Sequence, residues 1–184
     1  MTLLIPDKSA WVAMPKQGKN KEIFAFKTSL TLKHKTVEGW MIYERIRWGK
    51  KNLKAFGDFK AFYWIPLVIN GNFYHFEMHN SKKTAHKWYL ENEKIKVESI
   101  PDFELNIIKT ERDRKSGRKN IPKSIQLKVP NWKIDISLDS KGSQVGHGKK
   151  FPKGLAYYRQ SILLPKKDSK TQGYGMLELI LEDN

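Results

Sequence analysis

Apolar and polar residues alternate along most of this chain with a period of two. From Phe24 to Leu32 the even-numbered positions carry most of the apolar side chains. Such alternation places one set of side chains on each face of a β-strand, whereas a helix would repeat every three to four residues. Similar short runs follow: "VEGWMIYERIRWG", "FKAFYWIPLVI", "AHKWYLE", "KIKVESI", "FELNIIK", "SIQLKV", "KIDISL", "AYYRQSILL" and "YGMLELIL". Clusters of Gly, Pro, Asn, Asp, Ser and Lys separate them, so the pattern predicts about ten or eleven strands.

The Asn70-Gly71 pair stands between two of these runs and predicts a tight hairpin turn. Many short strands at regular spacing are typical of a barrel or a sandwich. The sequence contains neither an evident linker nor an internal repeat. We therefore expect one all-β domain over residues 1–184, with an N-terminal arm at 1–22 and an antiparallel barrel at 23–182.

Charge and composition narrow the possible partners. Lys and Arg number 35 against 19 acidic residues, a formal net charge of +16, which favours anionic partners such as nucleic acid. The basic runs, however, are dispersed between apolar segments, at 49–54, 111–119, 148–153 and 165–170. This dispersal favours solvated turns, so nucleic-acid binding is not expected, although it stays open as an alternative. No leader and no membrane span are evident, and a cytoplasmic protein is expected. Cysteine is absent, which excludes disulfides.

His75, Glu77 and His79 occupy every second position after the Asn-Gly turn. On a strand they share one face, and two imidazoles with one carboxylate could hold zinc or iron. The opposite face carries Tyr74, Phe76 and Met78, which make a better core. We therefore predict that the histidines face solvent and that no metal binds there. No cofactor is expected either.

Two carboxylates interrupt apolar faces. Glu44 shares its face with Trp40, Ile42 and Trp48, so it is either paired with a cation or suited to act as a general acid. A bulge in this strand would turn it outward instead. Glu178 alternates with leucines, and because the leucine side is the better core, solvent exposure of Glu178 is an equal alternative.

The order of several motifs resembles the C-terminal lipocalin-like barrel of the AttH/carotenoid 1,2-hydratase family. They are "EGWMIYERIRWG", "AFYWIPLVINGNF", "RKSGRKNIPKSIQLKVPNWKIDISL", "LAYYRQSILL" and "GYGMLELIL", spanning roughly residues 30 to 181. The resemblance implies a lipocalin-like barrel of about eight to eleven strands. It also implies acid-catalysed hydration or cyclisation of an isoprenoid, with Glu44 and Glu178 at the family's glutamate positions. Ile42 and Tyr43 replace the aspartate and arginine of the family motif, so the acid set is incomplete.

Together these features predict a barrel that binds a hydrophobic small molecule, such as an isoprenoid, polyene or lipid. The expected cavity wall consists of Trp40, Trp48, Trp64 and Tyr158. Glu44, expected to point into the barrel, and Glu178 are the candidate catalytic residues. A ligand carrier without chemistry, and an anion-binding protein that uses its basic loops, are the alternatives.

Overall fold

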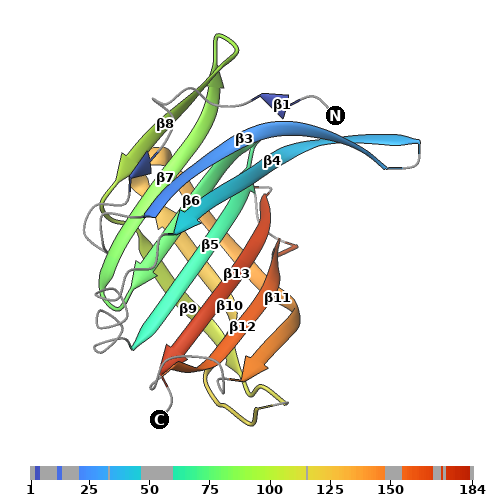
Figure 1. The fold of residues 1–184 in the computed structure, drawn as a ribbon. Coiled ribbons are helices and arrows are strands. Elements are labelled where there is room, and N and C mark those ends of the chain that lie inside the picture. Colours follow the sequence, from blue (N-terminus) through green and yellow to red (C-terminus); the bar gives the residue numbers. More distant parts are fainter. Residues whose placement is uncertain are drawn as a thin grey trace.

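The protein is built almost entirely of antiparallel strands arranged in two sheets (Figure 1). The computed structural model describes residues 3–4, 12–13, 21–32, 34–46, 60–114, 116–147, 155–167, 171 and 173–182. The small sheet contains β1 (Leu3–Leu4), β2 (Val12–Ala13), β3 (Lys21–Leu32) and β4 (Lys35–Ile46). The large sheet contains β5 (Ala61–Ile69), β6 (Asn72–His79), β7 (Lys82–Glu91), β8 (Lys94–Ile100), β9 (Glu104–Glu111), β10 (Ile121–Val129), β11 (Ile134–His147), β12 (Leu155–Pro165) and β13 (Gly173–Glu182). The all-β expectation is confirmed.

The nine-stranded sheet curls strongly into a half-barrel (Figure 1). Its strand order is β8-β7-β6-β5-β13-β12-β11-β10-β9. Two meanders, β5 to β8 and β9 to β13, therefore meet where the first strand of the sheet pairs with the last. One short 3-10 turn, Pro130–Trp132, joins β10 to β11.

The predicted hairpin turn lies between β5 and β6, where Ile69 pairs with Asn72. Asn70 and Gly71 both have positive φ, 49° and 77°. This is the conformation that a two-residue hairpin needs and that Asn-Gly adopts at low cost. The sequence prediction is confirmed at this position.

The inner face of the half-barrel is lined mainly with apolar side chains. Tyr74 and Phe76 of β6 stack their rings with centroids 6.2 Å apart, and Phe76 also meets Phe103 edge-on at 5.2 Å. Leu177 and Leu179 of β13 are buried in the same core. As the alternation predicts, one face of each of these strands is therefore core. The described inner positions are therefore mostly core, whereas the outer face of the sheet carries most of the polar side chains predicted as site residues.

The small sheet covers part of the outer face (Figure 1). Ile23 and Ala25 of β3 pack there against Phe73, Trp88 and Ile95 in a second apolar cluster. The indole of Trp40 on β4 donates from Nε1 to the carbonyl oxygen of Gly71, 2.8 Å away, and fixes β4 to the β5–β6 turn. The strand with Trp40 and Glu44 was expected to belong to the barrel, but it pairs with β3 in the small sheet.

In the part of the chain that the structure describes, no helix is long and apolar enough to span a membrane.

Candidate functional site on the outer face

A row of polar and aromatic side chains crosses the outer face of the half-barrel. Strand pairing sets Glu178 opposite Trp64, and Trp64 opposite Glu77. The row continues to Gln160 on one side and Thr84 on the other. Because directly paired residues share a face, side chains from five strands lie side by side. Trp64 and Glu178, both predicted as site residues, are thus neighbours.

Glu178 accepts two hydrogen bonds from β12. The hydroxyl of Tyr158 donates over 3.2 Å and the amide of Gln160 over 2.9 Å, both to Oε2. Burial, and then the Glu178 carboxylate, raises the pKa of Tyr158 to about 12. The phenol therefore keeps its proton at neutral pH and acts as a donor. Glu178 is held in one place, and Oε1 takes part in neither bond.

A histidine pair lies beside this row. The rings of His75 and His86 stack, with an interplanar angle of 9° and centroids 5.9 Å apart, and Trp64 meets His75 edge-on at 5.7 Å. His86 Nδ1 shares a hydrogen bond of 2.7 Å with the hydroxyl of Ser99. Nε2 of His75 lies 3.9 Å from Oε2 of Glu77.

The prediction that this face of β6 meets solvent is wrong for its central residues. His75 is 0% exposed and Glu77 is 4% exposed, while Tyr74 and Phe76 on the other face are also buried. The small sheet and the neighbouring strands cover the second face. His79 is only half-buried, and burial, followed by the nearby charge of Lys82, lowers its pKa. Among the described residues, no three His, Asp or Glu side chains are placed to hold a metal ion.

Glu44 faces this surface from the opposite side. It pairs with the fully buried Ile23 in the small sheet, two positions along β4 from Ile42, which packs in the outer apolar cluster. By strand alternation Glu44 points the same way as Ile42, and its Oε1 is fully buried. The residue expected to point into the barrel thus points toward the outer face of the half-barrel. Trp48 lies outside the described residues.

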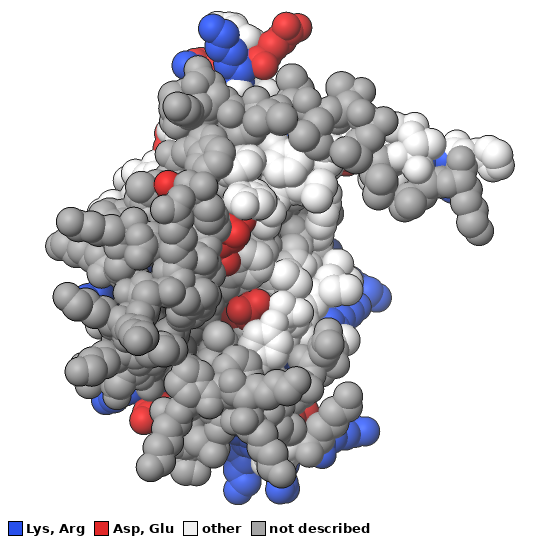
Figure 2. Space-filling view, in the orientation of Figure 1, with Lys and Arg blue, Asp and Glu red and all other residues white. Residues whose placement is uncertain are grey.

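Figure 2 shows this face of the molecule. Acidic side chains lie within a hollow beneath β3 and β4, whereas the blue Lys and Arg atoms lie toward the margins of the view. Two large apolar side chains on the outer face of β12 and β13 are exposed: Ile162 (58%) and Tyr174 (54%). The hollow therefore combines carboxylates with aromatic and aliphatic surface.

Part of this site was not found from the sequence. The structure brings together three of the predicted residues, Trp64, Tyr158 and Glu178, on the outer face of the large sheet. Trp40 and Glu44 lie on β4 of the small sheet instead. Gln160 and His86 were not predicted. Gln160 shares the face of Tyr158 by alternation, a signal that could have identified it.

Comparison with known proteins supports the fold. The chain is similar to a crystal structure of a Nitrosomonas europaea protein provisionally named AttH, with a TM-score of 0.58 and 12% sequence identity. The match covers 97% of this chain, which spans 58% of the length of that protein. No protein-family model matches the sequence, and neither does any curated protein. The likeness shows an AttH-like fold.

Proposed function

We propose that the outer hollow binds a hydrophobic small molecule, with Glu178 as its polar anchor. The observation that carries this proposal is the Tyr158–Glu178–Gln160 cluster, which holds a carboxylate beside Trp64 and close to exposed apolar surface. Binding sites for small molecules are mostly apolar, with a few fixed polar groups that set orientation. The AttH-like fold is compatible with ligand binding but does not name the ligand.

A ligand with an apolar body and a donor group, such as a hydroxyl, fits this arrangement. Its body would lie on Trp64 and the aliphatic side chains of β12 and β13, and its donor group would bond to Glu178. An isoprenoid or polyene alcohol has this chemistry. Among the described residues drawn in Figure 2, Lys and Arg lie toward the margins of the view, so an anionic polymer at the hollow would meet acidic groups.

Chemistry at this site would depend on Glu44. Its buried oxygen lies on the sheet surface that faces the half-barrel, so it could deliver a proton to a double bond of a ligand held beneath β4. Aromatic faces such as that of Trp64 could stabilise the resulting cation. If the protein is a carrier, Glu44 serves only to position the two sheets.

The binding proposal is tested with N-phenyl-1-naphthylamine, a neutral fluorescent probe of apolar sites. Trp64→Ala should weaken probe binding about tenfold, because an aromatic contact surface is lost. Glu104→Gln, on an exposed position of β9, is the control and should leave binding unchanged. Equal affinity of the Trp64→Ala protein and the wild type would contradict the proposal.

The identity and fate of the ligand need a second experiment. Organic extraction of the purified protein, followed by mass spectrometry, should yield an apolar alcohol at about one per chain. Glu178→Gln should reduce its occupancy, because a carboxylate accepts stronger hydrogen bonds than an amide. Turnover of the extracted compound that is lost in Glu44→Gln, with occupancy retained, would establish an enzyme; retention of turnover would make Glu44 non-catalytic.

A further inference from the structure

A second cluster of polar side chains lies on the inner face of β12, on the opposite side of the sheet from the outer hollow. Tyr157, Arg159 and Ser161 occupy successive inward-facing positions, and their exposed fractions are only 2%, 4% and 5%. The next inward residue, Leu163, is fully buried in the core. Polar residues thus occupy three successive inward-facing positions, where the inside of a half-barrel would be expected to carry aliphatic side chains.

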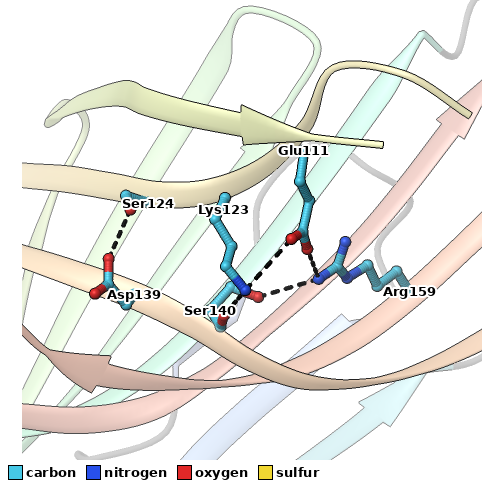
Figure 3. Close-up of polar contacts among 6 residues, drawn as sticks. All are labelled: Glu111, Lys123, Ser124, Asp139, Ser140 and Arg159. Carbon is cyan, nitrogen blue, oxygen red and sulfur yellow. Dashed lines mark hydrogen bonds and ion pairs between the residues drawn. The ribbon is translucent and has the colours of Figure 1, made fainter. Parts of the chain in front are cut away.

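An ion-pair network holds Arg159 in place (Figure 3). Its Nη2 donates to Oε1 of Glu111 over 2.6 Å and to the hydroxyl of Ser140 over 3.4 Å. Lys123 lies 3.3 Å from the other oxygen of Glu111 and donates to the carbonyl oxygen of Ser140. Burial alone would raise the pKa of Glu111, but hydrogen bonds and charge from Arg159 and Lys123 outweigh it and lower the pKa.

Three further donors of this group lack a well-aligned partner in the described part of the chain. Nε of Arg159, the hydroxyl of Tyr157 and the hydroxyl of Ser161 are buried and form no hydrogen bond of good geometry with the described residues, although Arg159 lies close enough to Tyr157 to act on its pKa. Buried polar atoms are nearly always bonded, and a cluster of exceptions needs an explanation. Three donors side by side on one strand match a single acceptor group, and a carboxylate offers about four acceptor positions.

The backbone around these donors is also irregular. On β11 the register shifts between Lys141 and Gln144, which pair with the two neighbours of Ser161, and Gly142 in this bulge has a φ of 60°. A second shift on β10 lies between Pro122 and Ser124. Bulges concentrate beside functional sites because they redirect side chains and interrupt close pairing. Here two bulges flank the same polar group.

Charge favours an anion at this place. Arg118 lies over the ring of Tyr157, 5.3 Å from its centroid, and adds a third cation to Arg159 and Lys123. Glu111 is bonded to two of these cations and Asp113 lies near Tyr157, so three cations face two carboxylates and one positive charge remains. Burial raises the pKa of Tyr157, and Asp113 adds to this while Arg159 opposes it, so the phenol stays protonated and can donate.

We propose that this polar row binds the carboxylate of a small acid with an apolar chain. The carboxylate accepts hydrogen bonds from Arg159, Tyr157 and Ser161, and the chain extends toward the aliphatic inner face that begins at Leu163. This inner site is separate from the outer hollow, because the two lie on opposite faces of the same sheet.

Octanoate is a suitable probe, and octanol tests the need for the charge. Calorimetry on the whole chain should show octanoate binding, with octanol weaker by at least about tenfold. Tyr157→Phe and Ser161→Ala each remove one hydroxyl and should weaken octanoate binding about tenfold while the protein stays folded. Tyr158→Phe is the matched control: it changes the neighbouring residue on the outer face and should leave octanoate binding intact.

The proposals for the outer hollow and for the inner site can be contradicted independently of each other. Loss of probe binding in Trp64→Ala concerns the outer hollow, and loss of octanoate binding in Tyr157→Phe concerns the inner row. The inner site is overturned if octanoate does not bind, if octanol binds equally well, or if both hydroxyl variants bind octanoate as the wild type does. Any of these results would mean that buried water alone satisfies these donors.

Discussion

Tyr157 and Tyr158 are adjacent in β12, yet their hydroxyl groups lie on opposite faces of the half-barrel. Tyr157 is buried in the inner core, whereas Tyr158 donates to Glu178 on the outer face. Both have raised pKa values, chiefly through burial, so both act as donors at neutral pH. One strand therefore supplies a phenol to each of two separate polar clusters.

Tyr158 should make the protein sensitive to alkali. Its pKa is raised from 10.0 to about 12, so the folded state holds the phenolic proton more tightly than the unfolded state. This contribution to stability is fully present below pH 10 and is lost as the pH rises through about 12. Urea midpoints measured across this range should fall less steeply for Tyr158→Phe than for the wild type. Tyr174→Phe, an exposed control, should follow the wild type; identical slopes for all three would refute the prediction.

Glu111 should make the stability of the protein depend on pH in the acidic range. Its pKa lies below the ordinary value of 4.5, so its contribution to stability is present above that pH and is lost as the pH falls through the lower, folded value. Glu111→Gln cannot show this loss. Its urea midpoint should therefore change less than that of the wild type as the pH is lowered through this range. Glu104→Gln serves as the exposed control, and an equally flat response there would show that the effect is not specific to Glu111.

Gly175 should not tolerate a side chain. A Cβ atom there would lie 2.0 Å from the carbonyl oxygen of Pro66 and 2.9 Å from the Cα of Leu67, both backbone atoms of β5. Because β13 would have to move away from β5, Gly175→Ala should lower the free energy of unfolding by about 3 kcal/mol. Gly39→Ala meets nothing within 4 Å and should change it by less than about 0.5 kcal/mol. Chemical denaturation of both variants gives the comparison.

Zinc should not bind at the buried histidines. His75 is enclosed by the rings of His86 and Trp64, and the neighbouring Glu77 is also buried, so a metal ion would have to displace packed side chains. Dialysis against micromolar zinc, followed by elemental analysis, should leave less than one ion per chain. One tightly held ion that disappears in His75→Ala would contradict this. His79→Ala, on the same strand but half-buried, is the control.

The strands, their alternation and the Asn70-Gly71 turn could be predicted because they depend on local sequence. The sequence could not predict which other part of the protein covers each face of a strand, and β6 is an example. Its alternation separates Tyr74 and Phe76 from His75 and Glu77, but both sets are buried because the small sheet packs on the second face. When a segment distant in sequence packs on the polar face of a strand, the local pattern alone wrongly predicts that this face is exposed to solvent.

Some residues of the candidate site could be predicted from the sequence, but the face of the sheet on which they lie could not. Trp64, Tyr158 and Glu178 lie close together in the structure. They could be selected from the sequence because each one stands out in the local alternation of apolar and polar residues. Trp64 and Tyr158 were expected to line the inside of the barrel, where the described positions carry core side chains instead. The role of Arg159 could not be predicted, since it depends on Glu111, a residue remote in sequence.

The pairing of β5 with β13 also bears on the order in which the protein folds. Within the nine-stranded sheet these are the first and last strands in sequence, and they meet at its centre. Contacts between such distant segments form slowly, because a long loop of chain must close before they can be made. During synthesis, Trp64 would emerge long before its partner Glu178. The outer hollow thus assembles only after the two halves of the sheet have joined, and ligand binding there would report that β13 has paired with β5.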